Sequence, residues 1–174
     1  HDPLGEDAIH DGMQFPTAER FAYHLGWQVP APEQVAAARR LADEFYATAD
    51  RLGHVYTKLY PGVRQMLDDL SVRGLPMGIV TNNRNTVILA LLRHLGLQSH
   101  LPVVVAEEDV GLPKPDPEGV RLAAERLGAR VERTVFVGDS RSDAEAAENA
   151  GAIGVGIAWQ AASIVHTRPG TYEH

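Results

Sequence analysis

Apolar residues follow two different patterns along the chain, and the change falls near residue 59. From residue 16 to 58 they recur at three- and four-residue steps, which is typical of amphipathic helices. Thr17 can cap a first helix that carries Phe21 and Leu25, and two prolines separate it from a longer second helix. The second helix has one apolar stripe, made of Val35, Ala38, Ala42, Phe45, Ala49 and Leu52. This part of the chain is predicted to be helical, with no convincing strand.

After residue 60 the pattern predicts helices and strands in alternation. We expect helices at 62–73, 86–95, 117–127 and from about Asp143 to Gly151, and strands at 75–80, 102–106, 134–137 and 153–158. The helix at 86–95 is almost wholly apolar, so it should be buried on more than one side. Alternation of this kind implies parallel strands joined by crossover helices. The chain is therefore predicted to be α/β, with a helical region over residues 1–58 and an α/β core over residues 59–174.

Two carboxylates follow the predicted strand at 134–137, a short β-branched run that should be buried. Asp139 stands at the carboxyl end of that strand, where open α/β sheets bind their ligands, and Asp143 begins the next helix four residues later. We therefore expect both carboxylates to face one crevice. Hard oxygen ligands in this arrangement suit magnesium better than zinc, so the pair predicts a magnesium site.

Two further polar motifs lie beside the other predicted strands. Thr81 and Asn82 end the strand at 75–80, and a hydroxyl with backbone amides at the start of a helix is a good cradle for phosphate oxygens. Lys114 lies among prolines in the segment 111–117, which restricts the backbone and holds one ammonium in a fixed place. Together with the two carboxylates, these residues are predicted to bind a phosphoryl group and its metal.

Composition and charge narrow the function. The 174 residues are 44% hydrophobic, which is enough to bury a core, and their lack of cysteine excludes a disulfide framework, a thiolate zinc site and a cysteine nucleophile. The lack of cysteine also fits a reducing cytoplasm. No apolar stretch has the length of a membrane span and nothing resembles a signal peptide, so we expect no membrane partner. A formal charge of −7 argues against nucleic acid as a partner and leaves small anionic substrates open.

The order and spacing of these motifs resemble the haloacid dehalogenase (HAD) superfamily of phosphohydrolases. An apolar strand with Thr-Asn, then Lys-Pro-Asp-Pro, then Val-Gly-Asp-Ser with a second aspartate is specific to that pattern, and the resemblance runs from about Tyr60 to Trp159. The segment at 60–63 and the helical region before it resemble members with a helical cap inserted after the first strand, such as the phosphoglycolate phosphatases. The resemblance implies a Rossmann-like, three-layer parallel sheet with a small helical cap over 1–58.

The resemblance also implies roles for the five candidate residues. Thr81 would hydrogen-bond the transferring phosphoryl group with Asn82 beside it, and Lys114 would neutralise charge on the phosphoryl oxygens and on the nucleophile. Asp139 would bind Mg2+, and Asp143 would help to hold the metal or orient the lysine. The implied activity is hydrolysis of a small phosphorylated metabolite, a phosphomonoester, through an aspartyl phosphate.

The chain departs from the family at the nucleophile. The family carries its nucleophile and general acid in an Asp-x-Asp motif at the end of a central first strand, whereas residues 1–12 contain no four-residue apolar run. Aligning Asp11 and Gly12 with the second aspartate and its glycine would put Ile9 in place of the nucleophile. We therefore expect the chain to start just after the motif, which leaves two neighbouring strands unpaired beside an uncovered apolar slot. Another segment, a second copy of the chain or the missing amino end would fill the slot, so an oligomer is one way to complete the sheet.

Two alternatives stay open at the level of sequence. The segment Gly138-Asp139-Ser140 after an apolar strand also resembles the motif of Gly-Asp-Ser esterases, in which Ser140 would be the nucleophile, although no Asp-x-x-His pair follows residue 143. The other alternative is a non-catalytic protein of the same fold that serves in binding or assembly, and the missing nucleophile favours it.

Overall fold

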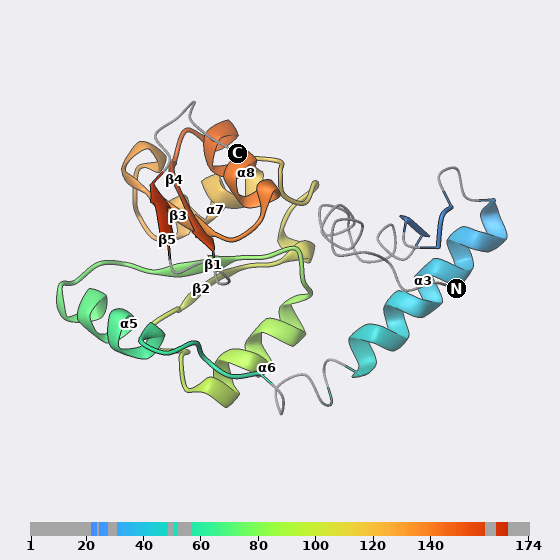
Figure 1. The fold of residues 1–174 in the computed structure, drawn as a ribbon, viewed down its shortest axis with the longest axis horizontal. Helices are drawn as coiled ribbons and strands as arrows, with labels where there is room; N and C mark the ends of the chain where they lie inside the picture. Colours follow the sequence, from blue (N-terminus) through green and yellow to red (C-terminus); the bar gives the residue numbers. More distant parts are fainter. Residues whose placement is uncertain are drawn as a thin grey trace.

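The computed structural model describes residues 22–23, 25–27, 31–48, 51, 57–158 and 163–166. They form an α/β core with two separate sheets, and a long helix lies to one side of it (Figure 1). The elements are α3 (Pro32–Thr48), α5 (Val63–Val72), β1 (Gly78–Val80), α6 (Asn85–Leu95), β2 (Val103–Val105), η2 (Glu107–Asp109), α7 (Glu118–Arg126), η3 (Val131–Arg133), β3 (Val135–Gly138), α8 (Arg141–Ala150), β4 (Ile153–Ala158) and β5 (Ser163–His166). The predicted α/β class is confirmed. No helix within the described ranges is both long and apolar enough to cross a membrane.

The first sheet consists of two parallel strands, β1 and β2, and helices cover both of its faces. Both strands are short apolar runs, as predicted, although β1 begins only at Gly78. On one face Ile79 and Val104 pack against buried side chains of α5, α6 and the turn after α6, namely Leu67, Ile88, Leu92 and Leu97. On the other face α7 comes so close that a Cβ atom added to Gly119 would lie 2.9 Å from Val80. The first sheet is therefore enclosed.

The second sheet consists of β3, β4 and β5 in that order. Strands β3 and β4 are parallel, as predicted, and β5 joins β4 in the antiparallel direction. The sequence did not predict β5, because the last strand expected was the one at 153–158. One face of β3 packs through Phe136 against small buried side chains of α7, α8 and the turn after α8, namely Val120, Ala146, Ala147, Ala150 and Ala152. The alanines let α8 lie close to this sheet.

The core helices follow the predicted ranges, with two differences. Helix α8 begins at Arg141, two residues before the predicted start, because Ser140 is its N-cap; it ends at Gly151 as predicted, where φ is 81°. Helix α6 was expected to be buried on more than one side, and this prediction is wrong. Leu89 is 40% exposed, and the buried residues of α6 share one face, namely Val87, Ile88 and Leu92.

Helix α3 is the predicted long amphipathic helix, but its buried stripe differs by one residue. Ala38 and Ala42 are buried as predicted, whereas Phe45 is 46% exposed and Tyr46 is buried in its place. A hydrogen bond explains this difference, because the Tyr46 hydroxyl donates to a carboxylate oxygen of Glu107 at 3.0 Å and so turns the Tyr46 ring toward the core. The predicted positions Thr17, Phe21, Ala49 and Leu52 lie outside the described residues, and Leu25 lies in a turn.

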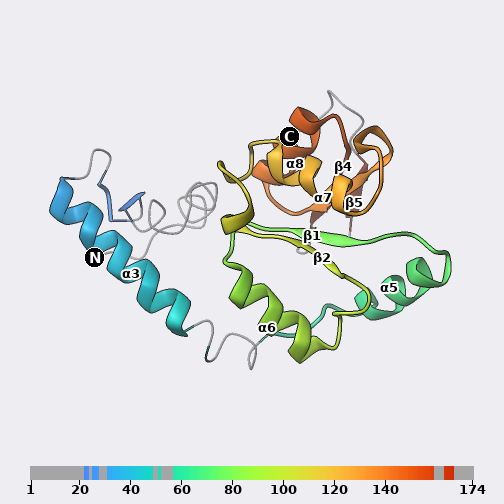
Figure 2. The ribbon, with the colours of Figure 1, turned by 180° about the vertical axis from the view of Figure 1, so that it is seen from behind.

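No hydrogen bond joins the two sheets in the described part of the chain. Within its own sheet β1 lies nearer to the second sheet than β2 does (Figure 1, Figure 2). The predicted burial of β3 is wrong, because Val135 and Val137 are 54% and 51% exposed. They are exposed because β3 has a strand on one edge only and nothing described covers that side of it. Among the described strands, β1 and β3 are each paired on one edge only, as expected from the sequence.

Candidate functional site

Lys114 is held in place by the backbone of its own loop, which connects η2 to α7. The Asn82 side chain makes two hydrogen bonds to the backbone of this loop. Its amide nitrogen donates to the Lys114 carbonyl at 3.2 Å, and its oxygen accepts from the Lys114 amide at 2.9 Å. From the other side, Asn149 of α8 donates to the Pro115 carbonyl at 3.2 Å. The loop is therefore fixed both to the end of β1 and to the helix that packs on β3.

The ammonium of Lys114 lies between the carboxyl ends of the two sheets. Nζ donates to Asp143 Oδ1 at 2.5 Å and to the Val80 carbonyl at 3.3 Å, and it lies 5.7 Å from the centre of the Phe136 ring. The side chains of Lys114 and Asp143 are only 13% and 10% exposed, so water screens this ion pair little. An ammonium has three donors, and one remains for a ligand oxygen after these two contacts.

Asp143 is both the partner of Lys114 and part of the cap of α8. Its Oδ2 accepts from the Ser140 hydroxyl at 2.6 Å and from the Ser140 amide at 3.1 Å, while the Ser140 oxygen accepts from the Asp143 amide at 3.2 Å. Burial raises the pKa of Asp143, but the Lys114 charge and the hydrogen bonds from Lys114 and Ser140 outweigh it and hold the pKa below its ordinary value. Gly138 makes room for this arrangement, because a Cβ atom there would overlap the Asp143 side chain.

Thr81 lies directly after β1, and its backbone is tied to β2. The Thr81 amide donates to the Val105 carbonyl at 2.9 Å, and its hydroxyl oxygen accepts from the Asn83 amide at 3.1 Å. The hydroxyl hydrogen stays available for a ligand. Thr81 therefore offers a donor next to the residue that fixes the Lys114 loop, and the phosphate cradle stays a prediction.

Asp139 is the predicted residue that the structure does not join to the others. It follows β3 and is exposed, and none of the hydrogen bonds or ion pairs of the described residues links it to Thr81, Asn82, Lys114 or Asp143. The described part of the chain also contains no group of three or more histidine, cysteine, aspartate or glutamate side chains that could hold a metal. Hydrogen bonds thus join Asn82, Lys114 and Asp143 into one connected set. Thr81 precedes Asn82 in the chain, and Asp139 lies beside the set with no described hydrogen bond to it.

The two carboxylates are nevertheless compatible with magnesium. This ion usually keeps several waters and is held by one or two carboxylates together with substrate phosphate, so a three-carboxylate cluster is not required. Both oxygens of Asp143 already accept hydrogen bonds, from Lys114 and from Ser140, whereas Asp139 is exposed and no described side chain bonds to its carboxylate. Asp139 is therefore the better placed ligand, and Asp143 is better placed to orient the lysine.

Sequence reasoning missed three residues of this site. Ser140 could have been found, because Ser140 and Asp143 have the spacing of a capping box, with an acid three residues after the serine. Nothing in the local sequence indicates that Asn149 would hold the Lys114 loop, or that Phe136 would lie beside the ammonium. The esterase hypothesis loses its nucleophile, because the Ser140 hydroxyl bonds to Asp143 and Ser142, and no described histidine bonds to it.

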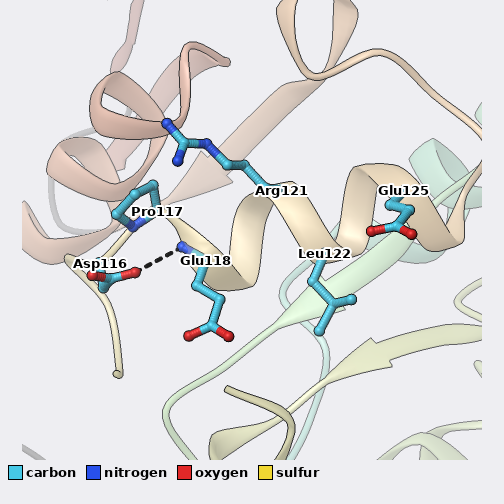
Figure 3. A pocket seen from close by; sticks show the side chains of 6 residues that line it. All are labelled: Asp116, Pro117, Glu118, Arg121, Leu122 and Glu125. Carbon is cyan, nitrogen blue, oxygen red and sulfur yellow. Dashed lines mark hydrogen bonds between the residues drawn. The ribbon is translucent and has the colours of Figure 1, made fainter. Parts of the chain in front are cut away.

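A pocket of about 340 Å³ lies elsewhere, along α7 and the two residues before it (Figure 3). It is lined by Asp116, Pro117, Glu118, Arg121, Leu122 and Glu125, and it includes none of the five candidate residues. The Asp116 carboxylate caps α7 by accepting from the Glu118 amide at 2.9 Å, and Arg121 donates to the Asn149 carbonyl at 2.8 Å. Three carboxylates against one guanidinium disfavour an anionic ligand, so the candidate site stays at Lys114.

Comparison with known proteins gives a family and several relatives. A sequence profile described as haloacid dehalogenase-like hydrolase matches residues 8–157. The phosphoglycolate phosphatase of Escherichia coli strain K12 is 39% identical over 131 residues, which are 75% of this chain and 51% of that protein. The chain therefore spans about half the length of the curated relatives it matches.

Solved structures with the same fold are also similar. A Bacteroides fragilis protein described as a haloacid dehalogenase-like hydrolase has a TM-score of 0.76 at 29% identity, over 89% of this chain and 71% of that one. A Thermotoga maritima protein described as a β-phosphoglucomutase has a TM-score of 0.61 at 28% identity, over 87% of this chain and 68% of that one. The α/β fold, predicted from the alternation of helices and strands and from the family resemblance, is therefore found in proteins similar to this chain.

Proposed function

Because the chain belongs to the haloacid dehalogenase-like hydrolase family, we propose that it is the core of a magnesium-dependent phosphatase that acts on a small phosphomonoester. The observation that supports this most is the ion pair of Lys114 and Asp143 at 2.5 Å, between the ends of two sheets. Phosphoryl transfer depends mainly on positioning and on stabilisation of charge, and a fixed, little-exposed ammonium supplies both.

Thr81 and each residue of the connected set have a role in this proposal. Lys114 donates its remaining N–H to a phosphoryl oxygen and stabilises the charge that develops there. Thr81 donates its hydroxyl hydrogen to a second oxygen. Asn82 holds the loop that carries Lys114 through its two hydrogen bonds to the lysine backbone, so it acts by positioning. Asp143 keeps the ammonium charged and oriented.

Magnesium is part of the proposal, with Asp139 as the residue that would hold it and Asp143 beside it. When bound, the ion would neutralise phosphoryl charge and help to orient the substrate. Asp139 is suited to this because its carboxylate is exposed and engaged with no other described side chain.

The proposed reaction passes through an aspartyl phosphate, and the sequence contains no Asp-x-Asp motif that would supply its nucleophile and general acid. The competing proposal is therefore a non-catalytic protein of the same fold. The two proposals differ in whether the native protein forms the aspartyl phosphate.

We further propose that residues 1–58 act as a cap over the site and that the remainder of the chain is the core. Contacts between α3 and the start of the core support this. Arg84 donates to Asp43 at 2.9 Å and lies 4.0 Å over the ring of Tyr46, whose hydroxyl donates to Glu107 at 3.0 Å. Arg84 follows Thr81 by three residues and Asn82 by two, so these contacts hold α3 close to the site. A cap at this place would exclude water from the reacting group.

The first substrate to test is 2-phosphoglycolate, because the curated relatives are named phosphoglycolate phosphatases. Neither nucleic acid nor a membrane is part of the proposal, since the net charge is −7, and the absence of cysteine favours a cytoplasmic location. A second copy of the chain is a partner to be tested.

The experiment is phosphate release by the native protein, whose length is fixed by intact mass. Turnover of 2-phosphoglycolate and of p-nitrophenyl phosphate is measured with Mg2+ and again with a chelator. The proposal expects magnesium-dependent turnover that the chelator abolishes. A native protein that includes an Asp-x-Asp strand and still releases no phosphate would favour the non-catalytic alternative.

A further inference from the structure

The Thr81 side chain is oriented by the turn that follows β1. Its hydroxyl oxygen accepts from the Asn83 amide at 3.1 Å, which fixes one lone pair of the oxygen. The hydroxyl hydrogen must then point elsewhere, because a hydroxyl has one hydrogen and two lone pairs in separate directions. The direction of the Thr81 donor therefore depends on where Asn83 lies.

Asn83 is in turn held by η2, which follows β2. The Glu107 amide donates to the Asn83 carbonyl at 3.1 Å. A carboxylate oxygen of Glu108 accepts from the Asn85 amide at 3.0 Å. These two hydrogen bonds tie the turn after β1 to η2, so a shift of η2 would move the turn that carries Thr81.

A buried side chain of α3 holds both η2 and this turn. Tyr46 is 2% exposed, and its hydroxyl donates to a carboxylate oxygen of Glu107 at 3.0 Å. The guanidinium of Arg84 lies 4.0 Å from the centre of the Tyr46 ring. One ring of α3 thus contacts η2 through its hydroxyl and the turn after β1 through its face.

The Tyr46 hydroxyl does more than fill space. Phenylalanine has nearly the same shape, so packing of the ring alone would not require a hydroxyl at this position. Hydrogen bonds to a carboxylate are stronger than those between neutral groups, and here the bond is made by a buried ring. The hydroxyl therefore begins a path of three hydrogen bonds, which passes from Tyr46 to Glu107, from Glu107 to Asn83 and from Asn83 to Thr81.

We propose that Tyr46 is a positioning residue of the phosphoryl site, whose hydroxyl holds the Thr81 donor in place through Glu107 and Asn83. Tyr46 itself touches no substrate. The docking of α3 on the core thus orders the turn that carries Thr81. Its effect on turnover rests on the proposed phosphatase activity, whereas its hold on the turn does not.

The first test is Tyr46→Phe, which removes the hydroxyl and keeps the ring, with amide exchange followed by NMR. The amides of Asn83 and Glu107 should exchange at least about tenfold faster in the variant. The Ile153 amide, which donates to Thr134 in the second sheet, should change less than about twofold. Equal acceleration of all three amides would indicate general destabilisation and would overturn the proposal, as would unchanged exchange at Asn83.

Three further variants serve as controls for the hydrogen bond. Glu107→Gln keeps an oxygen that can accept from Tyr46 and should restore slow exchange at Asn83, whereas Glu107→Ala should match Tyr46→Phe. Tyr60→Phe removes a hydroxyl from a tyrosine that is 53% exposed and should leave exchange at Asn83 unchanged. Equal effects of the glutamine and alanine variants, or an effect of Tyr60→Phe as large as that of Tyr46→Phe, would contradict the proposal.

The second test measures turnover of 2-phosphoglycolate by the native protein with Mg2+. Tyr46→Phe should lower kcat about tenfold and leave KM within about twofold, because the donor is displaced from the reacting group. In a Thr81→Val background the same change should have less than about a twofold effect on kcat, since the hydroxyl on which Tyr46 acts is gone. Additive losses would overturn the proposal.

The two tests separate this inference from the proposed function. If the native protein releases no phosphate, the phosphatase activity fails, and amide exchange alone decides whether Tyr46 holds the Thr81 turn. If the native protein is active and Tyr46→Phe keeps its kcat, the phosphatase activity stands and the positioning role is wrong.

Discussion

The two sheets are built from similar apolar runs, yet their neighbours enclose them very differently. Val105 of β2 is 1% exposed, because α7 covers one face of the first sheet and α5 and α6 cover the other. Val137 of β3 is 51% exposed, because the described residues pair only one edge of β3 and cover only one of its faces. An apolar run therefore predicts a strand, whereas the burial of that strand depends on elements far away in the sequence.

The candidate site lies between the carboxyl ends of the two sheets. Thr81 and Asn82 follow β1 of the first sheet. Asp139 follows β3 of the second sheet, and Asp143 lies on α8, which packs on β3. Lys114 connects them, since its ammonium contacts both and its loop is fixed to both. Four changes test this comparison. They remove the Lys114 ammonium, fill the space at Gly138 beside Asp143, shorten a valine in each sheet, and remove the charge of Asp143.

The largest effect is expected for Lys114→Ala in the native protein. Loss of the ammonium removes charge stabilisation at the phosphoryl group, so kcat/KM for a phosphomonoester should fall about 10³-fold, or about 4 kcal/mol. Lys58→Ala is the matched control, because Lys58 is the only other lysine and is exposed. A loss of less than tenfold in Lys114→Ala would remove the lysine from the mechanism.

Gly138→Ala should produce the next largest effect, on stability. The added Cβ atom would overlap the Asp143 side chain, so the free energy of unfolding should fall by about 3 kcal/mol as the second sheet adjusts. Gly111→Ala is the control, because a Cβ atom there meets its nearest neighbour, Glu118, at 3.5 Å. Urea unfolding measures both variants, and equal stability of the two would show that Asp143 can move freely.

The difference in burial between the sheets predicts a difference in the cost of truncation. Val105→Ala should lower the free energy of unfolding by about 2 kcal/mol, whereas Val137→Ala should lower it by less than about 1 kcal/mol. The same chemical change is made in both strands, so each variant is the control for the other. Equal losses in urea unfolding would mean that β3 is as enclosed as β2.

The smallest effect is expected in the acid dependence of stability. The pKa of Asp143 is lowered in the folded chain, so its ionised form contributes stability that is present above its unfolded value and is lost as the pH falls through the folded value. We expect a loss on the order of 1 kcal/mol below about pH 4. Asp143→Asn should remove this part of the pH dependence, and an unchanged acid profile would contradict the assignment.

The sequence predicted most of this core because local signals and the fold agree there. The strand β4 has the predicted bounds, and α8 ends at Gly151 as predicted, because glycine readily adopts the left-handed conformation required there. The strand β5 could not be predicted, since a four-residue segment becomes a strand only by pairing with β4. The burial of Tyr46 in place of Phe45 depends on Glu107, which is 61 residues away.

The site shows the same division between local and distant causes. Lys114 was identified because prolines around it restrict the loop, and Asp143 because of its position after a strand. Their direct ion pair, and the support from Asn149 and Phe136, come from tertiary contacts that carry no local signal. Sequence reasoning also grouped Asp139 with the others, whereas its side chain makes no bond to them.

The most direct test of the account is a titration of the chain with inorganic phosphate in the presence of Mg2+, followed by NMR of its backbone amides. The account predicts that Thr81 and Asn82 at the end of the first sheet and Asp139 and Ser140 at the end of the second shift together, with one apparent Kd. The shifts should be absent in Lys114→Ala. Shifts confined to one sheet, or to the pocket on α7, would contradict the claim that Lys114 joins the two sheets into one phosphoryl-binding site.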